Sequence, residues 1–381
     1  RTETILLKLV LKMERLVTSN LRLGIIAGGQ LGKMLIQEAS KWDIITYVLD
    51  NDVDCPAGKI ATKYVQGSHL DFDSVYRFGK MVDILTFEME NINIEALQRL
   101  KSEGLKIVPD PDILELIQDK GLQKDFYREN EIPTAAYTFY ESETEILNGI
   151  EQGEISFPFV QKLRKGGYDG RGVAVINDSS ELKKLLPGAS LIEEKVEIAK
   201  EIATIVARNK KGEIKCYPVV EMLFDHNANL VDKIICPSSI TDKQSEKVIS
   251  FSEKIIELLN MEGLLAVEFF IDSKGEVIVN EMAPRTHNSG HHTIESIITS
   301  QFEQHLRAIL NLPLGSTELK LNSVMINIVG ANDCEGRVVY EGLTESLAID
   351  GVKIHLYGKK ITKPYRKMGH ATVLSSSLEV A

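Results

Sequence analysis

The chain has 381 residues, of which 43% are hydrophobic and 26% charged. This is an ordinary water-soluble composition, long enough for two or three lobes around a shared cleft. The formal net charge is −11 without a dominant basic block, which disfavours broad nucleic-acid binding. No stretch reaches the roughly 20 apolar residues of a membrane helix. Cys55, Cys216, Cys236 and Cys334 lack CxxC spacing, which indicates idle thiols in a reducing cytoplasm rather than a zinc site or disulfides.

Residues 1–20 precede the first recognisable element. The apolar positions between Leu6 and Leu11 are interrupted by Lys8, and the run is too short for a signal peptide and has no clear cleavage site. We therefore interpret 1–20 as an extension without a catalytic role.

The next segment predicts a parallel sheet. An apolar run at 23–27 leads into Gly28-Gly-Gln-Leu-Gly32, residues 31–40 have helical spacing, and 44–49 form a second apolar run. Strand, glycine turn, helix and strand make a βαβ unit. Asp50 follows at a distance that imitates a dinucleotide fingerprint, but the glycine pattern is one residue short of GxGxxG.

A further strand is predicted at 84–91, and it ends in the carboxylates of Glu88 and Glu90 and the amide of Asn91. The carboxyl ends of strands in open α/β sheets point into the ligand crevice. Glu88 is therefore a candidate site residue, with a solvated turn as the alternative. Helices with aspartate caps are predicted next, at 111–118 and 119–130.

A glycine-rich loop lies between the strand-like runs that end at 163 and begin at 173. Gly166-Gly-Tyr-Asp-Gly-Arg-Gly172 has four glycines in seven residues, which allow positive φ and a close approach of backbone N–H groups to an anion. Lys162 and Arg171 flank the loop with positive charge. The pattern favours a phosphate site, and a flexible hairpin tip is the alternative.

Two later apolar runs, 264–272 and 276–281, predict a β-hairpin. With Lys274-Gly275 as a two-residue loop, Glu268 faces Glu281 on the neighbouring strand, with Cβ atoms about 5 Å apart. Like charges at that distance repel unless a cation lies between them, and oxygen ligands suit Mg²⁺. A loop longer by one residue would place the two carboxylates on opposite faces.

Residues 280–292, Asn-Glu-Met-Ala-Pro-Arg-Thr-His-Asn-Ser-Gly-His-His, form the densest polar cluster. So many ionisable groups beside apolar sequence add little to folding, and they suit a site for anions and a metal. A solvated loop is the alternative. In an extended segment Arg285 and His287 project to the same side. We expect a helix from Ser289 to Leu310 and a strand at 324–330.

The glycine loop and Asn280-Glu281 together resemble the ATP-grasp superfamily. The strings at 28–32, 166–172 and 280–291 occur in the order typical of the 5-(carboxyamino)imidazole ribonucleotide synthase family. The resemblance runs from about Leu21 to His370. It implies an α/β ATP-grasp fold with an N-terminal parallel-sheet pre-ATP-grasp domain, a small central lobe and a larger C-terminal α+β lobe. The implied limits are 1–20, 21–118, 119–196, 197–314 and 315–381.

The resemblance also implies the roles of individual residues. Carboxyphosphate, the reaction intermediate, would be held by Arg285, His287, Asn288 and Ser289. ATP would be bound by Lys120, Lys162, Gly167, Tyr168, Asp169, Gly170, Arg171, Gly172, Glu193, Glu194, Lys195, Val196, Glu201, Asn280 and Glu281. The ribonucleotide would be bound by Gln30, Leu31, Glu88, Tyr168, Asp169, Arg171, Lys359 and Arg366. Mg²⁺ would be held by Glu268 and Glu281, the adenine edge would meet residues 193–196, and Glu201 would meet the ribose.

The implied reaction uses ATP, bicarbonate and 5-aminoimidazole ribonucleotide, in a cytoplasmic homodimer that binds neither nucleic acid nor membrane. A formate-dependent glycinamide ribonucleotide transformylase is an alternative, since it shares the N-terminal pattern and an acyl phosphate intermediate. It lacks the strings at 166–172 and 287–291. A non-catalytic nucleotide-binding regulator is a third possibility, against which the intact Glu268, Glu281, Arg285 and His287 argue.

Overall fold

The computed structural model describes residues 18–167, 172–225 and 230–378. The chain starts with a five-stranded parallel sheet in the order β3-β2-β1-β4-β5. After a short 3₁₀ turn (Thr18–Asn20), the elements are β1 (Arg22–Ile26), α2 (Gln30–Ser40), β2 (Ile45–Asp50), β3 (Lys63–Gln66), α3 (Phe72–Gly79), β4 (Ile84–Phe87), α4 (Ile94–Ser102), β5 (Lys106–Ile107) and α5 (Pro111–Gln118). The predicted βαβ unit is confirmed by the parallel pairing of β1 with β2.

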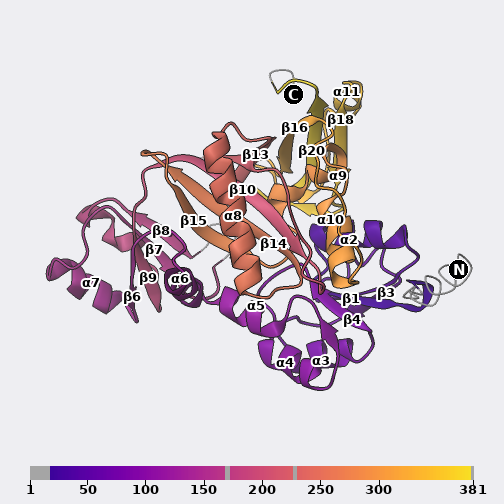
Figure 1. The fold of residues 1–381 in the computed structure, drawn as a ribbon, viewed down its shortest axis with the longest axis horizontal. Helices are drawn as coiled ribbons and strands as arrows, with labels where there is room; N and C mark the ends of the chain where they lie inside the picture. Colours follow the sequence, from indigo (N-terminus) through magenta and orange to yellow (C-terminus); the bar gives the residue numbers. More distant parts are fainter. Residues whose placement is uncertain (1–17, 168–171, 226–229, 379–381) are drawn as a thin grey trace, which may run out of the picture.

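The small lobe is a four-stranded antiparallel sheet in the order β6-β9-β7-β8, at the left of Figure 1. Its elements are α6 (Lys120–Glu129), β6 (Tyr137–Tyr140), α7 (Glu143–Glu151), β7 (Phe159–Leu163), β8 (Val173–Ile176), a 3₁₀ helix (Ser179–Lys184) and β9 (Ser190–Glu194). Lys162 pairs with Val173, which confirms that β7 and β8 form a hairpin around the glycine loop. Residues 168–171 of that loop lie outside the described residues.

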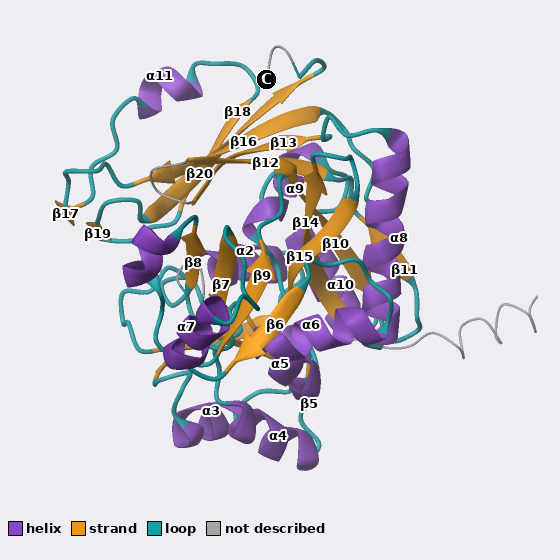
Figure 2. Cartoon of the chain, turned by 90° about the vertical axis from the view of Figure 1, so that its left-hand side faces the viewer, coloured by secondary structure: helices purple, strands orange, loops and turns teal. Residues whose placement is uncertain are grey.

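A nine-stranded sheet forms the rest of the molecule, in the order β15-β14-β10-β12-β13-β16-β20-β18 with β11 paired to β10. Its elements are β10 (Ile198–Arg208), β11 (Ile214–Cys216), β12 (Val220–Asp225), β13 (Leu230–Cys236), α8 (Asp242–Leu258), β14 (Gly263–Asp272), β15 (Val277–Ala283), a 3₁₀ turn (Asn288–Gly290), α9 (Thr293–Ser296), α10 (Gln301–Ile309), β16 (Asn322–Val329), α11 (Leu343–Leu347), β18 (Val352–Leu356) and β20 (Lys367–Ser375). The small pair β17 (Gly336–Arg337) and β19 (Ile361–Thr362) stands beside it. Figure 2 shows β16, β18 and β20 continuing the sheet of β12 and β13.

Helices cover both faces of this sheet near β14. Ile255 of α8 packs with Val267 and Phe269 on one face. On the other face Ala308 of α10 packs with Ala266. The strands between the two helices are therefore fixed by packing on both sides, which makes them a rigid base for side chains at their ends.

The hairpin of β14 and β15 differs from the predicted one in its loop. Ile271 pairs with Val277, and the Asp272 N–H donates to the Glu276 carbonyl at 3.0 Å, so the loop has three residues. Gly275 closes it with a φ of +82°, the left-handed conformation that three-residue hairpin loops require. The prediction of a two-residue loop was therefore wrong.

The predicted pairing of the two glutamates is nevertheless confirmed, because a second irregularity restores the register. Phe269 faces Val279 whereas Glu268 faces Glu281, so Asn280 is the extra residue of a β-bulge. The alternation of buried and half-buried residues along β15 slips at the same point, where Asn280 and Glu281 are both half-buried. The bulge thus turns two consecutive side chains away from the core.

The prediction of one helix from Ser289 to Leu310 was also wrong. The segment is divided into a 3₁₀ turn, α9 and α10. Ile297 is extended (φ −115°, ψ 154°) and forms a bridge with Leu319, and Ser300 caps α10 by accepting from the Glu303 N–H. The helical spacing of the apolar residues was real, but Ile297 packs against a distant segment and interrupts the helix.

Candidate active site

Charged side chains of the small lobe meet the end of β15. Asp119 caps α6 by accepting from the Gly121 N–H, which places Lys120 at the start of the helix. The Lys120 Nζ lies 2.5 Å from a Glu281 carboxylate oxygen, and the Lys162 Nζ donates to Asn280 Oδ1 at 2.9 Å. A small cavity of about 10 Å³ is lined by Lys120, Gln123, Lys124, Lys162, Glu193, Asn280 and Glu281.

Glu193 joins two of these lysines. Its two oxygens lie 2.7 Å from the Lys124 Nζ and 2.8 Å from the Lys162 Nζ, and its side chain is only 4% exposed. Burial opposes ionisation, but the two lysines hold the pKa of Glu193 below its usual value. Burial lowers the pKa of Lys124 to about 8. Three lysines thus converge on one small space, which suits a polyanion such as a triphosphate.

The opposed carboxylates lie beside this cluster. Glu268 pairs with Ala203 of β10 as well as with Glu281. Burial, and then the negative charges of Glu281 and Glu201, raise the pKa of Glu268, whereas Lys120 lowers the pKa of Glu281. The two carboxylates therefore respond to opposite influences, as expected of like charges that compete for one compensating cation.

The donor set of this pair fits Mg²⁺. Within the described ranges, no group of three or more His, Cys, Asp or Glu residues could enclose a metal ion. Two carboxylates are the share that a protein commonly supplies to Mg²⁺, because this ion keeps waters and binds substrate phosphates for its remaining positions. Glu268 and Glu281 would hold it.

Arg285 lies just beyond β15 and reaches back to the N-terminal domain. Its Nη2 is 2.8 Å from a carboxylate oxygen of Glu90, and its Nη1 donates to the Thr286 carbonyl at 3.1 Å. Arg285 and His287 are half-buried and Thr286 is buried, in agreement with the predicted alternation of side chains along an extended segment.

His287 is fixed through its backbone and its ring. Its N–H donates to Gln301 Oε1 at 2.8 Å, and its carbonyl accepts from Gln301 Nε2 at 2.7 Å. The ring Nδ1 accepts from the Ser289 N–H at 3.3 Å and lies 2.9 Å from the Ser289 hydroxyl. Because Nδ1 is an acceptor, the ring proton is assigned to Nε2, which lies 3.7 Å from Glu268.

Asn288 stands between these residues with an unsatisfied amide. Both polar atoms of its side chain are buried and have no hydrogen-bond partner among the described residues. Buried side-chain amides nearly always have partners. An amide that offers one donor group and one acceptor suits an oxygen-rich ligand with a proton, as the predicted catalytic role requires.

On the N-terminal side, the Glu88 carboxylate lies against the start of α2. It accepts from the Gly29 N–H at 2.6 Å and from the Gly32 N–H at 2.5 Å. A Cβ at residue 29 would lie 2.2 Å from a Glu88 oxygen, so this close approach requires glycine. Burial raises the pKa of Glu88, although the two N–H groups act to lower it. Gln30 opens α2, while the Leu31 side chain is buried in the core.

The two basic residues of the C-terminal segment have local partners. The Lys359 Nζ donates to the Lys367 carbonyl at 2.8 Å and lies 5.7 Å above the Tyr357 ring. The Arg366 Nη1 donates to the Ile361 carbonyl at 2.8 Å.

This segment is docked on the N-terminal domain. Lys33 of α2 donates to the Leu356 carbonyl at 2.8 Å, and Lys59 donates to the Gly358 carbonyl at 2.5 Å. Lys359 is therefore held next to the helix that Gln30 begins.

Four other residues predicted to bind ATP lie on β9, directly after it, and on β10. Glu201 pairs with Phe270 at the end of the large sheet, and burial raises its pKa to about 7. Glu194 and Lys195 are exposed at the end of β9, where the Lys195 Nζ donates to Asn177 Oδ1 at 3.0 Å. Val196 is half-buried. Tyr168, Asp169, Gly170 and Arg171 lie outside the described residues, between Gly167 and Gly172.

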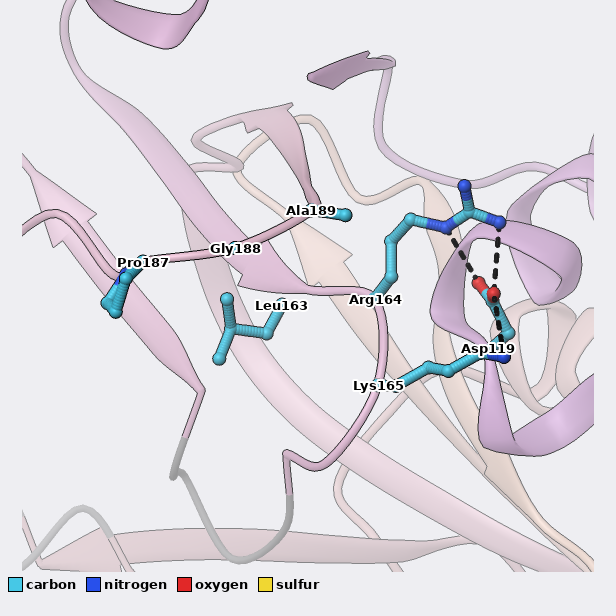
Figure 3. A pocket seen from close by; sticks show the side chains of 7 residues that line it. All are labelled: Asp119, Leu163, Arg164, Lys165, Pro187, Gly188 and Ala189. Carbon is cyan, nitrogen blue, oxygen red and sulfur yellow. Dashed lines mark hydrogen bonds and ion pairs between the residues drawn. The ribbon is translucent and has the colours of Figure 1, made fainter. Parts of the chain in front are cut away.

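A separate pocket of about 400 Å³ lies at the base of the β7–β8 hairpin, and none of the predicted catalytic residues line it. Figure 3 shows its main polar feature, a fork in which Arg164 Nε and Nη2 donate to the two oxygens of Asp119 at 3.0 and 2.9 Å. The Lys120 N–H donates to the Arg164 carbonyl at 2.8 Å. This fork therefore holds the start of α6 against the end of β7.

Three residues of the site were missed by the sequence analysis. Lys124 follows Lys120 by four residues, so helical spacing on α6 could have revealed that both project from one face. Glu90 follows Glu88 by two residues, and alternation could have revealed it too. Gln301 had no such signal, because its role depends on a turn that brings α10 back to His287.

The fold and this arrangement of lysines and carboxylates define an ATP-grasp protein. Residues 125–302 match the ATP-grasp domain model, residues 21–118 the ribonucleotide synthetase preATP-grasp domain, and residues 323–381 the phosphoribosylaminoimidazole carboxylase C-terminal domain. The predicted α/β ATP-grasp fold is confirmed.

Known proteins narrow the class to one family. The chain is 34% identical to the N5-carboxyaminoimidazole ribonucleotide synthase of Bacillus subtilis over 92% of this chain and 91% of that protein. It is 35% identical to the chloroplastic phosphoribosylaminoimidazole carboxylase of Vigna aconitifolia, over 93% of this chain and 64% of that protein. The chain therefore belongs to the N5-carboxyaminoimidazole ribonucleotide synthase family, and it spans about two thirds of the length of the Vigna protein.

Solved structures agree with this family. The Thermotoga maritima N5-carboxyaminoimidazole ribonucleotide synthetase superposes with a TM-score of 0.86 at 44% identity, covering 94% of this chain and 95% of that one. The Aspergillus clavatus N5-carboxyaminoimidazole synthase, solved in complex with ADP and 5-aminoimidazole ribonucleotide, gives a TM-score of 0.87 at 30% identity, with 96% of each chain covered.

Proposed function

We propose that the protein carboxylates 5-aminoimidazole ribonucleotide with bicarbonate at the expense of ATP. The products are N5-carboxyaminoimidazole ribonucleotide, ADP and phosphate, as part of purine biosynthesis. The observation that carries the proposal is the charged cluster at the end of β15, where Glu281 opposes Glu268 and the Lys120 ammonium group, and the His287 ring lies 3.7 Å from Glu268. Arg285 lies two residues before His287 on the same segment and supplies a guanidinium fork suited to an anion. The Aspergillus relative, which binds ADP and this ribonucleotide, supports the choice of substrate.

In the first step a bicarbonate oxygen attacks the terminal phosphorus of ATP, ADP leaves, and carboxyphosphate forms. Lys120 and Lys162 bind the phosphates from the small lobe, because both ammonium groups point at the end of β15. When bound at Glu268 and Glu281, Mg²⁺ supplies charge neutralisation for the phosphates. The protein contributes position and charge rather than a covalent intermediate.

In the second step the ribonucleotide amine attacks the carboxyl carbon, the C–N bond forms and phosphate leaves. Arg285 and His287 hold the intermediate, with the Asn288 amide and the Ser289 hydroxyl beside them. The leaving phosphate accepts the amine proton. Glu88, Gln30, Lys359 and Arg366 hold the ribonucleotide between the N-terminal domain and the C-terminal segment.

Several finer points belong to the same proposal. The protein would use Mg²⁺ and act as a homodimer, which light scattering on the purified chain tests directly. Among the described helices, none is long and apolar enough to cross a bilayer. The cytoplasmic location and the limits of the lobes stay predictions, and the name of the Vigna relative specifies a chloroplast.

One assay separates the candidate functions. ADP release is measured with bicarbonate plus aminoimidazole ribonucleotide, and in parallel with formate plus glycinamide ribonucleotide. ¹³C-bicarbonate with NMR detection identifies the product, because carboxyphosphate that hydrolyses before transfer would register as plain ATPase activity. We expect a ¹³C-labelled carbamate only in the first arm. Product in the formate arm would favour the transformylase, and no ADP release in either arm would favour the regulator.

A further inference from the structure

The carboxylate of Glu90 is placed to control Arg285. Glu90 lies in the loop after β4, two residues beyond Glu88, and its oxygen is 2.8 Å from Arg285 Nη2. The side chains are 24% and 17% exposed, so the pair is shielded from most of the solvent. A shielded, charge-assisted contact to a guanidinium is stronger and more directional than a surface ion pair.

The loop that carries Glu90 is itself anchored. The Gln118 side-chain amide donates to the Glu90 carbonyl at 2.7 Å and to the Ile92 carbonyl at 3.0 Å. The next residue, Asn93, caps α4 by accepting from the Ala96 N–H. Glu90 therefore presents its carboxylate from a fixed backbone, as a positioning group must.

The segment after β4 also contacts the glycine turn at the start of α2. Glu88 accepts from the N–H groups of Gly29 and Gly32, while Glu90 contacts Arg285. One short segment thus connects the loop predicted to hold the ribonucleotide with the arginine predicted to hold the intermediate. The two carboxylates that make these contacts are two residues apart on one backbone segment.

We propose that Glu90 is a positioning residue that fixes the plane of the Arg285 guanidinium for the transfer step. This inference rests on the proposed function, which assigns carboxyphosphate to Arg285. A guanidinium binds two oxygens in one plane only, and catalysis gains when such a fork is oriented before the reaction begins. Glu90 also offsets part of the Arg285 charge, so it improves orientation at some expense of simple anion attraction.

These two effects predict a specific kinetic signature. Glu90→Gln should lower kcat at least tenfold, because the fork loses its orientation. The KM for bicarbonate should stay the same or fall, because the arginine charge is no longer offset. A merely structural role would instead raise the KM values and lower the melting temperature. Asp83→Asn is the matched control, since Asp83 pairs with Arg22 at the opposite end of β4, and it should keep kcat within twofold.

A double-mutant cycle tests whether the effect acts through Arg285. In an Arg285→Lys background, Glu90→Gln should change kcat by less than twofold, because the fork that Glu90 orients is already gone. Equal losses in both backgrounds would overturn the proposal, as would an unchanged kcat in the single variant.

A second measurement keeps the test independent of the reaction. In ¹⁵N-arginine-labelled full-length protein, the Arg285 Nε–Hε signal is identified by its loss in Arg285→Lys. Glu90→Gln should shift or broaden that signal, and Asp83→Asn should leave it unchanged. If the carboxylation assay fails while this signal responds, the proposed function fails and the pairing stands. An unaffected signal in Glu90→Gln would remove the positioning role whatever the activity.

Discussion

At the scale of single residues, Glu281 links the opposed carboxylates to the lysine cluster. It opposes Glu268 across the hairpin and pairs with Lys120. Glu281→Gln removes one charge at nearly constant shape, so it should abolish ADP release while the melting temperature stays within a few degrees of the wild type. Glu276→Gln in the same hairpin is the control, because Glu276 is 64% exposed and pairs with Lys247 at the surface. Near-full activity of Glu281→Gln at saturating Mg²⁺ would remove the paired-carboxylate argument.

Glu201 gives a prediction about pH. Burial raises its folded-state pKa from 4.5 to about 7, so between those values the folded state binds more protons than the unfolded state, and stability falls as pH rises. Glu201→Gln cannot ionise. Without nucleotide, this variant should therefore melt at a higher temperature than the wild type at pH 8 and at a similar temperature at pH 5. Thermal melts at both values check this, and equal differences at the two pH values would contradict it.

At the scale of elements, the β14–β15 hairpin shows what the sequence could and could not predict. The apolar runs and Gly275 predicted the hairpin, and counting outward from an assumed two-residue loop predicted the pairing of Glu268 with Glu281. The sequence carried no sign of the bulge at Asn280, because a bulge depends on what lies across the strand. Here Lys162 of another lobe binds the Asn280 side chain, and only the folded chain brings the two together.

Substitutions of Gly275 in the hairpin loop test whether the loop or the bulge sets the pairing of Glu268 with Glu281. Gly275 has a φ of +82°, and a Cβ at this position would meet the Gln244 amide nitrogen at 3.5 Å, an ordinary contact. Gly275→Ala should cost about 1 kcal/mol of unfolding free energy through its left-handed backbone alone, and Gly275→Asn should cost less. Both should keep kcat, because the bulge rather than the loop sets the pairing of Glu268 with Glu281. Urea unfolding measures the first claim, and a large loss of kcat would refute the second.

The interrupted helix at 289–310 is a second case in which local sequence spacing could not predict a contact between distant segments. Local spacing favoured one helix, but Ile297 contacts Leu319 and the chain turns so that Gln301 reaches both backbone groups of His287. A continuous helix would carry Gln301 away from His287. The interruption thus serves the site, which explains why local patterns and the structure disagree there.

At the scale of the whole molecule, the site is assembled from segments far apart in the sequence. Glu88 and Glu90 come from the first domain, Lys120 and Lys162 from the small lobe, and Glu281 from the large sheet. Sequence motifs could identify most of these residues because each motif is local. The contacts between them, such as Glu90 with Arg285, could not be predicted, since they depend on how the lobes are docked.

The contact between the C-terminal segment and the N-terminal domain leads to a prediction about ribonucleotide binding. Lys359 is held beside the N-terminal domain through the contact of Lys33 with the Leu356 carbonyl, where it would meet the ribonucleotide phosphate together with Arg366. A charge-assisted contact of this kind is worth roughly 1.5–3 kcal/mol. Lys359→Ala and Arg366→Ala should each raise the KM for the ribonucleotide about ten- to hundredfold.

The KM for ATP should hardly change in either variant, because the lysine cluster that would bind ATP lies in the small lobe. Lys363→Ala is the matched control, since Lys363 lies between the two residues, is 59% exposed and has its Nζ 3.4 Å from Glu335. Initial rates at varied ribonucleotide and varied ATP give both constants. An equal loss for ATP, or the same effect in Lys363→Ala, would place the ribonucleotide phosphate away from Lys359 and Arg366 and separate the C-terminal segment from substrate binding.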